Sequence, residues 1–188
     1  MSKKEMQHRA EEAVRTLIEW SGDTTDREGL KDTPQRVALA YKEFFSGYAE
    51  DPKDILAQSF SEVGGYQDLI LVENIPFHSH CEHHMIPFFG IAHLAYIPKH
   101  RVVGFSRLIR VLEVFSRRLQ IQERLTNQVA NVIQDVLQPR GVAVLLSAQH
   151  LCMSMRGIRQ QGVYVKTQAF TGSMLDPVEQ ERLYQRLS

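Results

Sequence analysis

The sequence contains few cysteines and no excess of either charge. Its 188 residues include two cysteines and one tryptophan, and 22 basic side chains balance 22 acidic ones. Two cysteines cannot build the disulfide framework of a small secreted protein, so a reducing, cytoplasmic setting is expected. Zero net charge argues against a protein that coats nucleic acid, although it permits a local basic pocket.

Long apolar runs and glycine-rich phosphate loops are also missing. Residues 142–146 are typical of the longest apolar runs, far below the roughly 18 residues of a membrane helix. The N-terminus enters charged residues without an apolar segment, which predicts no secretory signal. Gly64 and Gly65 are too short a signal for a P-loop or Rossmann motif. We therefore expect neither a membrane partner nor a nucleic-acid partner.

Apolar periodicity predicts an α+β chain. The 43% hydrophobic fraction is that of a globular protein, and the length suits one domain with a small appendage. We expect an N-terminal helical segment over residues 1–60 and a catalytic domain over residues 61–188. The expected helices cover residues 3–20, 34–46, 104–119, 121–137 and 177–188, and the expected strands cover residues 69–76, 88–98, 142–155 and 163–170. Thr33 is the expected N-cap of the second helix, with Pro34 at its first position.

The order of these elements indicates an architecture. Two strands, a helix pair and two strands predict a four-stranded antiparallel sheet with the helix pair between strands two and three, packed on one face. Such a sheet has two open edges, which proteins commonly cover or pair between subunits. The pattern therefore favours an oligomer.

Half of the histidines lie in one cluster. Four of the eight fall within residues 78–84, together with Cys81, while Cys152 lies near His150 much later in the chain. Thiolate and imidazole groups are the usual zinc ligands. Cys81 and His84 are three positions apart and can reach one ion from a turn, and Cys152 can supply a third ligand.

The ligand count favours an open metal site. A closed structural zinc site needs four protein ligands, whereas only two sulfurs are present, so three ligands plus water fit better. His83 and His150 then become candidate proton carriers. Two alternatives remain: a structural zinc with His80 or His83 as fourth ligand, and a surface histidine patch beside a buried apolar Cys152 thiol.

The predicted strand over residues 142–155 carries a further expectation. Because side chains alternate, His150, Cys152, Ser154 and Arg156 would share one face. Arg156 would then lie about 13 Å from Cys152.

Several polar side chains suit an anion or a purine. Ser106, Arg107 and Arg110 occupy the first turn of a predicted helix, where cations oppose the helix dipole unless an anion docks there. Arg156 and Arg36 are further candidates, and the alternative is a solvated arginine face. Gln122 and Glu123 can read the donor edge of a guanine, although Glu123 also simply favours a helix N-terminus by its charge.

Five motifs in one order resemble the GTP cyclohydrolase I family. They cover roughly residues 33–175 and read Asp32-Thr-Pro-Gln-Arg, Cys81-Glu-His-His-Met-Ile-Pro-Phe, Gly104-Phe-Ser-Arg, Gln122-Glu-Arg-Leu-Thr and His150-Leu-Cys-Met-Ser-Met-Arg-Gly. The resemblance implies zinc-dependent conversion of GTP to 7,8-dihydroneopterin triphosphate with release of formate.

The resemblance also implies a role for each site residue. Zinc is held by Cys81, His84 and Cys152, and His83 and His150 carry protons. Ser106 lies near the ribose and phosphates. The triphosphate is gripped by Arg36, Arg107, Arg110 and Arg156, and the guanine is read by Gln122 and Glu123.

The fold implied is the tunnelling fold, assembled as a decamer of two five-membered rings with active sites at subunit interfaces. Two positions depart from the family pattern: Arg107 stands where lysine is expected, and Leu39 where a basic residue is common.

Two other functions remain open. One is a related enzyme of the same fold acting on another pterin or a deazapurine, and the other is a non-catalytic, zinc-stabilised purine-binding protein.

Overall fold

A computed structural model of the chain describes residues 1–61 and 64–187. These residues fall into two compact units, Met1–Ser46 and Gly47–Ser188. Each unit has its own elements and is described by itself.

The first unit is helical. It contains α1 (Lys3–Trp20), a 3-10 turn η1 (Glu28–Leu30) and α2 (Thr33–Phe44). Ser2 and Glu5 form a capping box at the start of α1, which satisfies two backbone donors there. In α2 the N-cap is Asp32, so the prediction of Thr33 was wrong by one residue. The Thr33 hydroxyl instead donates to the carbonyl of Gly29 at 3.4 Å.

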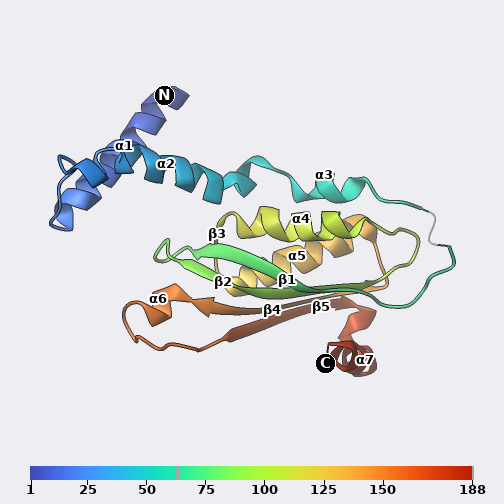
Figure 1. The fold of residues 1–188 in the computed structure, drawn as a ribbon. Helices are drawn as coiled ribbons and strands as arrows, with labels where there is room; N and C mark the ends of the chain where they lie inside the picture. The colour runs from blue at the N-terminus through green and yellow to red at the C-terminus, as the bar shows by residue number, and fades with distance from the viewer. Residues whose placement is uncertain (62–63, 188) are drawn as a thin grey trace. The chain divides into compact units, whose positions relative to one another are not determined.

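The second unit contains the sheet and the remaining helices (Figure 1). In chain order, after η2 (Ser46–Ala49) at the boundary, they are α3 (Pro52–Ala57), β1 (Ile70–Cys81), β2 (Pro87–Ile97), α4 (Phe105–Ser116), β3 (Leu119–Gln120), α5 (Gln122–Leu137), β4 (Gly141–His150), α6 (Leu151–Ser154), β5 (Val165–Gly172), η3 (Ser173–Leu175) and α7 (Pro177–Arg186).

The sheet has five strands rather than the four predicted. Its order is β3-β1-β2-β4-β5, and β3 runs parallel to β1 while the other pairs are antiparallel. The two residues of β3 pair with His80 and Cys81. A strand this short has no periodicity for sequence reasoning to detect. The α+β class is confirmed, and the purely antiparallel sheet is wrong.

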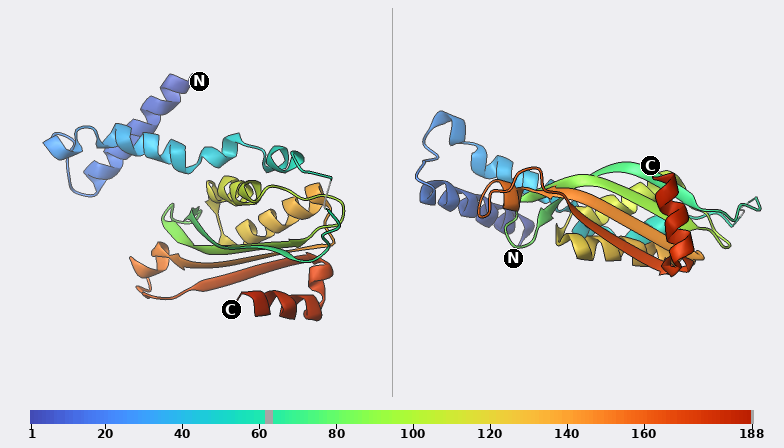
Figure 2. Two further views of the ribbon diagram at one scale, coloured as in Figure 1. Left: turned by 45° about the vertical axis from the view of Figure 1, so that its right-hand side comes forward. Right: turned by 90° about the horizontal axis from the view of Figure 1, so that it is seen from below.

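Alternation along the strands sends apolar side chains to both faces of the sheet. Leu94 of β2 and Val144 of β4 pack with the buried sides of α4 and α5. Their neighbours Ala95 and Ala143 join Leu183 of α7 in a second cluster. Helices therefore cover both faces, with the predicted pair on one and α7 on the other (Figure 2).

Three further differences from the predicted elements affect the site. β1 continues to Cys81, so much of the histidine cluster lies within a strand. β4 ends at His150, and the chain then turns into the short helix α6. Helix α3 was not predicted, although Asp51 caps it and Pro52 opens it, a pattern typical of helix starts.

Among the residues described, no helix is both long and apolar enough to cross a membrane.

Candidate metal centre

A tight turn after β1 brings His84 back over Cys81. The Cys81 amide donates to the carbonyl of Ile86 at 2.9 Å, and the Met85 amide donates to the carbonyl of Cys81 at 2.8 Å. Met85 adopts a positive φ of 54° in this turn. The turn places His84 Nδ1 3.8 Å from Cys81 Sγ.

The other half of the centre comes from β4 and α6. Pairing of β2 with β4 aligns His150 with Phe88, and the two rings stack with centroids 4.6 Å apart. The chain then turns into α6, which carries Cys152. The prediction that Cys152, Ser154 and Arg156 share a strand face with His150 was therefore wrong, because a helical turn has no alternation of period two.

Cys81, His84 and Cys152 form a group that can hold a metal ion. Their ligand atoms all lie within 4.8 Å of one another. Within residues 1–61 and 64–187, neither His80 nor His83 belongs to this group. Three ligands from the chain match the open type of site expected from the sequence.

The chemistry of the donor set fits a soft or borderline cation. Burial raises the pKa of the Cys152 thiol, and the neighbouring Cys81 raises it further. Two thiols this close are poor at ionising together, so a cation between them would stabilise both thiolates. Two sulfurs and an imidazole are ligands that zinc accepts.

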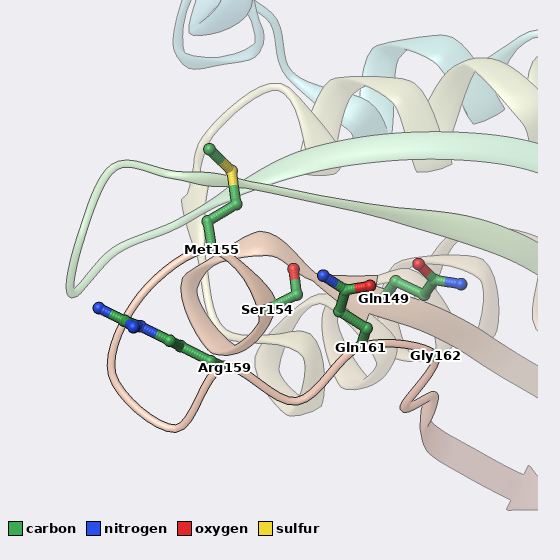
Figure 3. A pocket seen from close by; sticks show the side chains of 6 residues that line it. All are labelled: Gln149, Ser154, Met155, Arg159, Gln161 and Gly162. Atoms are coloured by element: carbon green, nitrogen blue, oxygen red, sulfur yellow. The ribbon is translucent and has the colours of Figure 1, made fainter.

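Arg156 lies beside the group rather than about 13 Å along a strand. Its Nη1 atom is 3.3 Å from His84 Nε2, because α6 folds the chain back. A cavity of about 670 Å³ opens next to this segment, lined by Gln149, Ser154, Met155, Arg159, Gln161 and Gly162. In Figure 3 the amides of Gln149 and Gln161 lie on one side of it and Arg159 extends away from them.

The two candidate proton carriers flank the group. His83 Nδ1 lies 3.8 Å from Cys81 Sγ, and its side chain is 66% exposed. His150 is half-buried, and burial lowers its pKa while the carboxylate of Glu123 opposes that shift. His83 therefore lies at the surface beside the candidate ligand Cys81, and His150 is half-buried two residues before Cys152.

Gln122 and Glu123 lie at the start of α5, but their side chains differ in access. Glu123 is exposed, whereas Gln122 is 1% exposed. The amide of Gln122 donates to the carbonyl of Val165 at 2.9 Å and its Oε1 atom is 2.8 Å from His150 Nε2. Both ends of this amide are engaged within the chain, so only Glu123 presents its side chain to a ligand.

Of the second-unit arginines predicted to bind an anion, Arg156 lies beside the metal group, whereas Arg107 and Arg110 bond elsewhere. Arg107 donates to the carbonyl of Ile55 at 3.0 Å and also bonds the side chain of Gln58. Arg110 pairs with two carboxylates, Glu50 at 2.7 Å and Glu113 at 2.5 Å. Arg36 belongs to the first unit, where its 75% exposed side chain pairs with Asp32.

Ser106 and Arg107 lie at the opposite end of β1 from Cys81. Phe105, which begins α4, lines one cavity together with Ile70 and Leu71. Cys81 follows Leu71 by ten positions in the same strand, a separation of about 30 Å. This distance exceeds the length of a nucleoside triphosphate, so one copy of the chain does not bring these groups onto one such molecule.

Comparison with known proteins decides the family. The family model described as GTP cyclohydrolase I matches residues 10–188. The chain belongs to the GTP cyclohydrolase I family. It is 56% identical over 179 residues to the GTP cyclohydrolase 1 of Brucella anthropi, covering 95% of this chain and 84% of that protein. It is 54% identical over 172 residues to that of Brucella suis, covering 92% and 81%.

A solved structure of the archaeosine synthase QueF-Like in the apo form also matches, with a TM-score of 0.44 and 16% identity. It covers 56% of this chain and 94% of that one. This likeness is too distant to carry an argument about the fold, and family membership does not depend on it.

One ion pair in this member of the GTP cyclohydrolase I family was missed by sequence reasoning. Glu82, in the turn between Cys81 and His84, accepts two hydrogen bonds from Arg124 of α5, at 2.6 and 3.1 Å. Arg124 lowers the pKa of Glu82. The pair ties the turn that carries His84 to the helix that carries Gln122. The two residues are 42 positions apart, so no local pattern signals their contact.

We expect Arg124→Gln to lower metal affinity about tenfold, because partners that orient metal ligands typically contribute 10- to 100-fold. The free energy of unfolding should stay close to the wild-type value, since exposed ion pairs contribute little to stability. Competition with a chromophoric chelator measures the first quantity and urea unfolding the second. Arg15→Gln, which removes the exposed pair with Glu12, is the control and should leave metal affinity unchanged.

Proposed function

We propose that this chain converts GTP and water to 7,8-dihydroneopterin triphosphate and formate, with zinc held by Cys81, His84 and Cys152. The observation that carries this proposal is the cluster of three ligand atoms within 4.8 Å in a chain of the GTP cyclohydrolase I family. The reaction is hydrolysis of C–N bonds in a cyclic amidine, followed by rearrangement of the ribose and closure of a pterin ring.

A zinc ion bound at this group supplies Lewis-acid activation of water. The residues of the chain do the remaining work. His83 and His150 carry protons to and from the guanine. The lowered pKa of His150 keeps its imidazole neutral near neutral pH, so that it can accept a proton.

Substrate recognition is divided among several elements. The exposed carboxylate of Glu123 suits the donor edge of guanine. Ser106 and the arginines Arg36, Arg107, Arg110 and Arg156 serve the ribose and triphosphate. Arg107 and Arg110 are engaged with acceptors of their own chain, which orients their guanidinium groups before a ligand arrives.

The active site is composite, formed by two copies of the chain. β1 separates Leu71, beside the start of α4, from Cys81 by about 30 Å. This separation supports a composite site, since a second copy is needed to supply the phosphate-binding half. We propose the tunnelling fold for the second unit and a decamer of two pentameric rings. Head-to-tail contacts between identical copies close into rings of this kind. The enzyme acts in the cytoplasm.

Incubation of the purified chain with GTP tests the reaction. After oxidation of the products, we expect a fluorescent pterin triphosphate, together with formate and loss of GTP. Recovery of unchanged nucleotide from metal-loaded protein would instead favour a different substrate for the same site. ATP is the matched control and should remain intact, because adenine lacks the 2-amino group and N1 hydrogen that a carboxylate accepts.

A further inference from the structure

Gln122 lies at the centre of a network of hydrogen bonds that ends at the His150 ring. Its amide nitrogen lies near three acceptors from two strands: the carbonyls of Val165 at 2.9 Å and Leu146 at 3.4 Å, and the hydroxyl of Thr167 at 3.1 Å. A carbonyl oxygen only accepts hydrogen bonds. The nitrogen end of the amide must therefore face β4 and β5, and the Oε1 end must face His150.

Two threonines fix the direction of the remaining bonds. The hydroxyl of Thr126 donates its one hydrogen to the backbone carbonyl of Gln122 at 2.7 Å. The oxygen of Thr126 then accepts from Thr167, 2.6 Å away. Thr167 has no second hydrogen, so its oxygen is the acceptor for the amide of Gln122.

This bonding pattern dictates which nitrogen of His150 carries hydrogen. Gln122 Oε1 lies 2.8 Å from His150 Nε2, and an amide oxygen needs a donor there. Nε2 is therefore the N–H atom of the neutral ring, and Nδ1 bears the lone pair. Over residues 1–61 and 64–187, no hydrogen-bond partner engages Nδ1. The stacked ring of Phe88, tilted by only 3°, holds the imidazole plane.

We propose that Gln122, held by Thr126 and Thr167, is a positioning residue for His150 rather than a reader of guanine. It keeps His150 Nε2 protonated and leaves Nδ1 as the atom that exchanges a proton with the substrate. This inference depends on the proposed function for its catalytic meaning, but the tautomer itself can be observed without turnover. Neither threonine was assigned a role from the sequence.

Nitrogen NMR of the 15N-histidine-labelled, metal-loaded protein in the solid state tests the tautomer. Comparison with His150→Gln assigns the signal. We expect Nδ1 of His150 at the shift of an unprotonated ring nitrogen and Nε2 at that of an N–H. A resting state with Nδ1–H would overturn the inference, even if GTP turnover were normal. Absence of turnover with the expected tautomer would instead contradict the proposed function.

Kinetics of matched variants test the positioning role. Gln122→Met should lower kcat by about 10- to 100-fold, the range of a misplaced general acid or base, while KM for GTP stays within about threefold. Thr167→Val should lower kcat in the same way, and Thr167→Ser, which retains the hydroxyl, should recover most of the loss. Metal content should remain at the wild-type level in all three variants.

Thr171→Val is the control, because it breaks a similar bond from β5 to α5, between Thr171 and Gln134 at 2.7 Å, and should leave kcat unchanged. A raised KM with wild-type kcat in Gln122→Met would overturn the inference and return this residue to guanine binding. Equal losses of kcat in Thr167→Ser and Thr167→Val would overturn the role of the hydroxyl.

Discussion

Cys152→Ser is expected to lose both its bound metal and its release of formate. A serine hydroxyl stays protonated at neutral pH and is a poor ligand for zinc, so only Cys81 and His84 would remain. Loss of Lewis-acid stabilisation worth several kcal/mol corresponds to a fall of about 10³-fold or more in kcat. Metal analysis of the purified variant and a formate assay with GTP measure the two effects.

Met155→Leu is the matched control for Cys152→Ser. Met155 lies just after α6 and its side chain is 69% exposed, so this change leaves the three ligand atoms in place. We expect wild-type metal content from it. If Cys152→Ser kept one metal per chain and full turnover, the assignment of the metal ligands would be wrong.

Two variants that are each impaired in a different half of the proposed site are expected to restore each other's activity when they assemble together. Cys152→Ser damages the metal half of the proposed composite site, and Arg107→Gln damages its phosphate half, at the other end of β1. The second change removes charged hydrogen bonds worth about 1.5–3 kcal/mol, which is about 10- to 100-fold in kcat/KM. Because the proposed site takes its two halves from different copies, a mixed assembly is expected to contain sites in which both halves are intact.

Coexpression with two different affinity tags gives such assemblies. Each half of a site is intact with a probability of about one half, so about a quarter of the sites should be active in a head-to-tail ring. Coexpression of Cys152→Ser with Cys81→Ser is the control and should restore nothing, since both changes fall on the same half. Activity no higher than the average of the two parents would exclude a composite site.

Sequence reasoning reached the metal group because its ligand types are rare and close together. Cys81 and His84 were predicted to meet in a turn, and the hydrogen bonds of Cys81 to Met85 and Ile86 form that turn. Cys152 lies with Cys81 and His84, as predicted, but on a helical turn rather than on a strand. Its segment is apolar and β-like in sequence, whereas in the structure β4 ends at His150 and the following residues form the helical turn α6.

Features that depend on distant contacts could not be predicted. Strand β3 is two residues long and exists because it lies beside β1. The roles of Thr126 and Thr167 depend on contact between α5 and β5, and nothing local distinguishes these threonines from others. Gln122 was predicted to read guanine, but burial under two strands turns its amide toward His150.

Zinc titration of the metal-free chain tests the central claim most directly. Formate release from GTP should be absent without metal, rise in proportion to added zinc, and reach its plateau at about one zinc per chain, as a single three-ligand site requires. Formate release at the plateau rate from metal-free protein, or none from protein holding one zinc per chain, would contradict a zinc-dependent GTP cyclohydrolase centred on Cys81, His84 and Cys152.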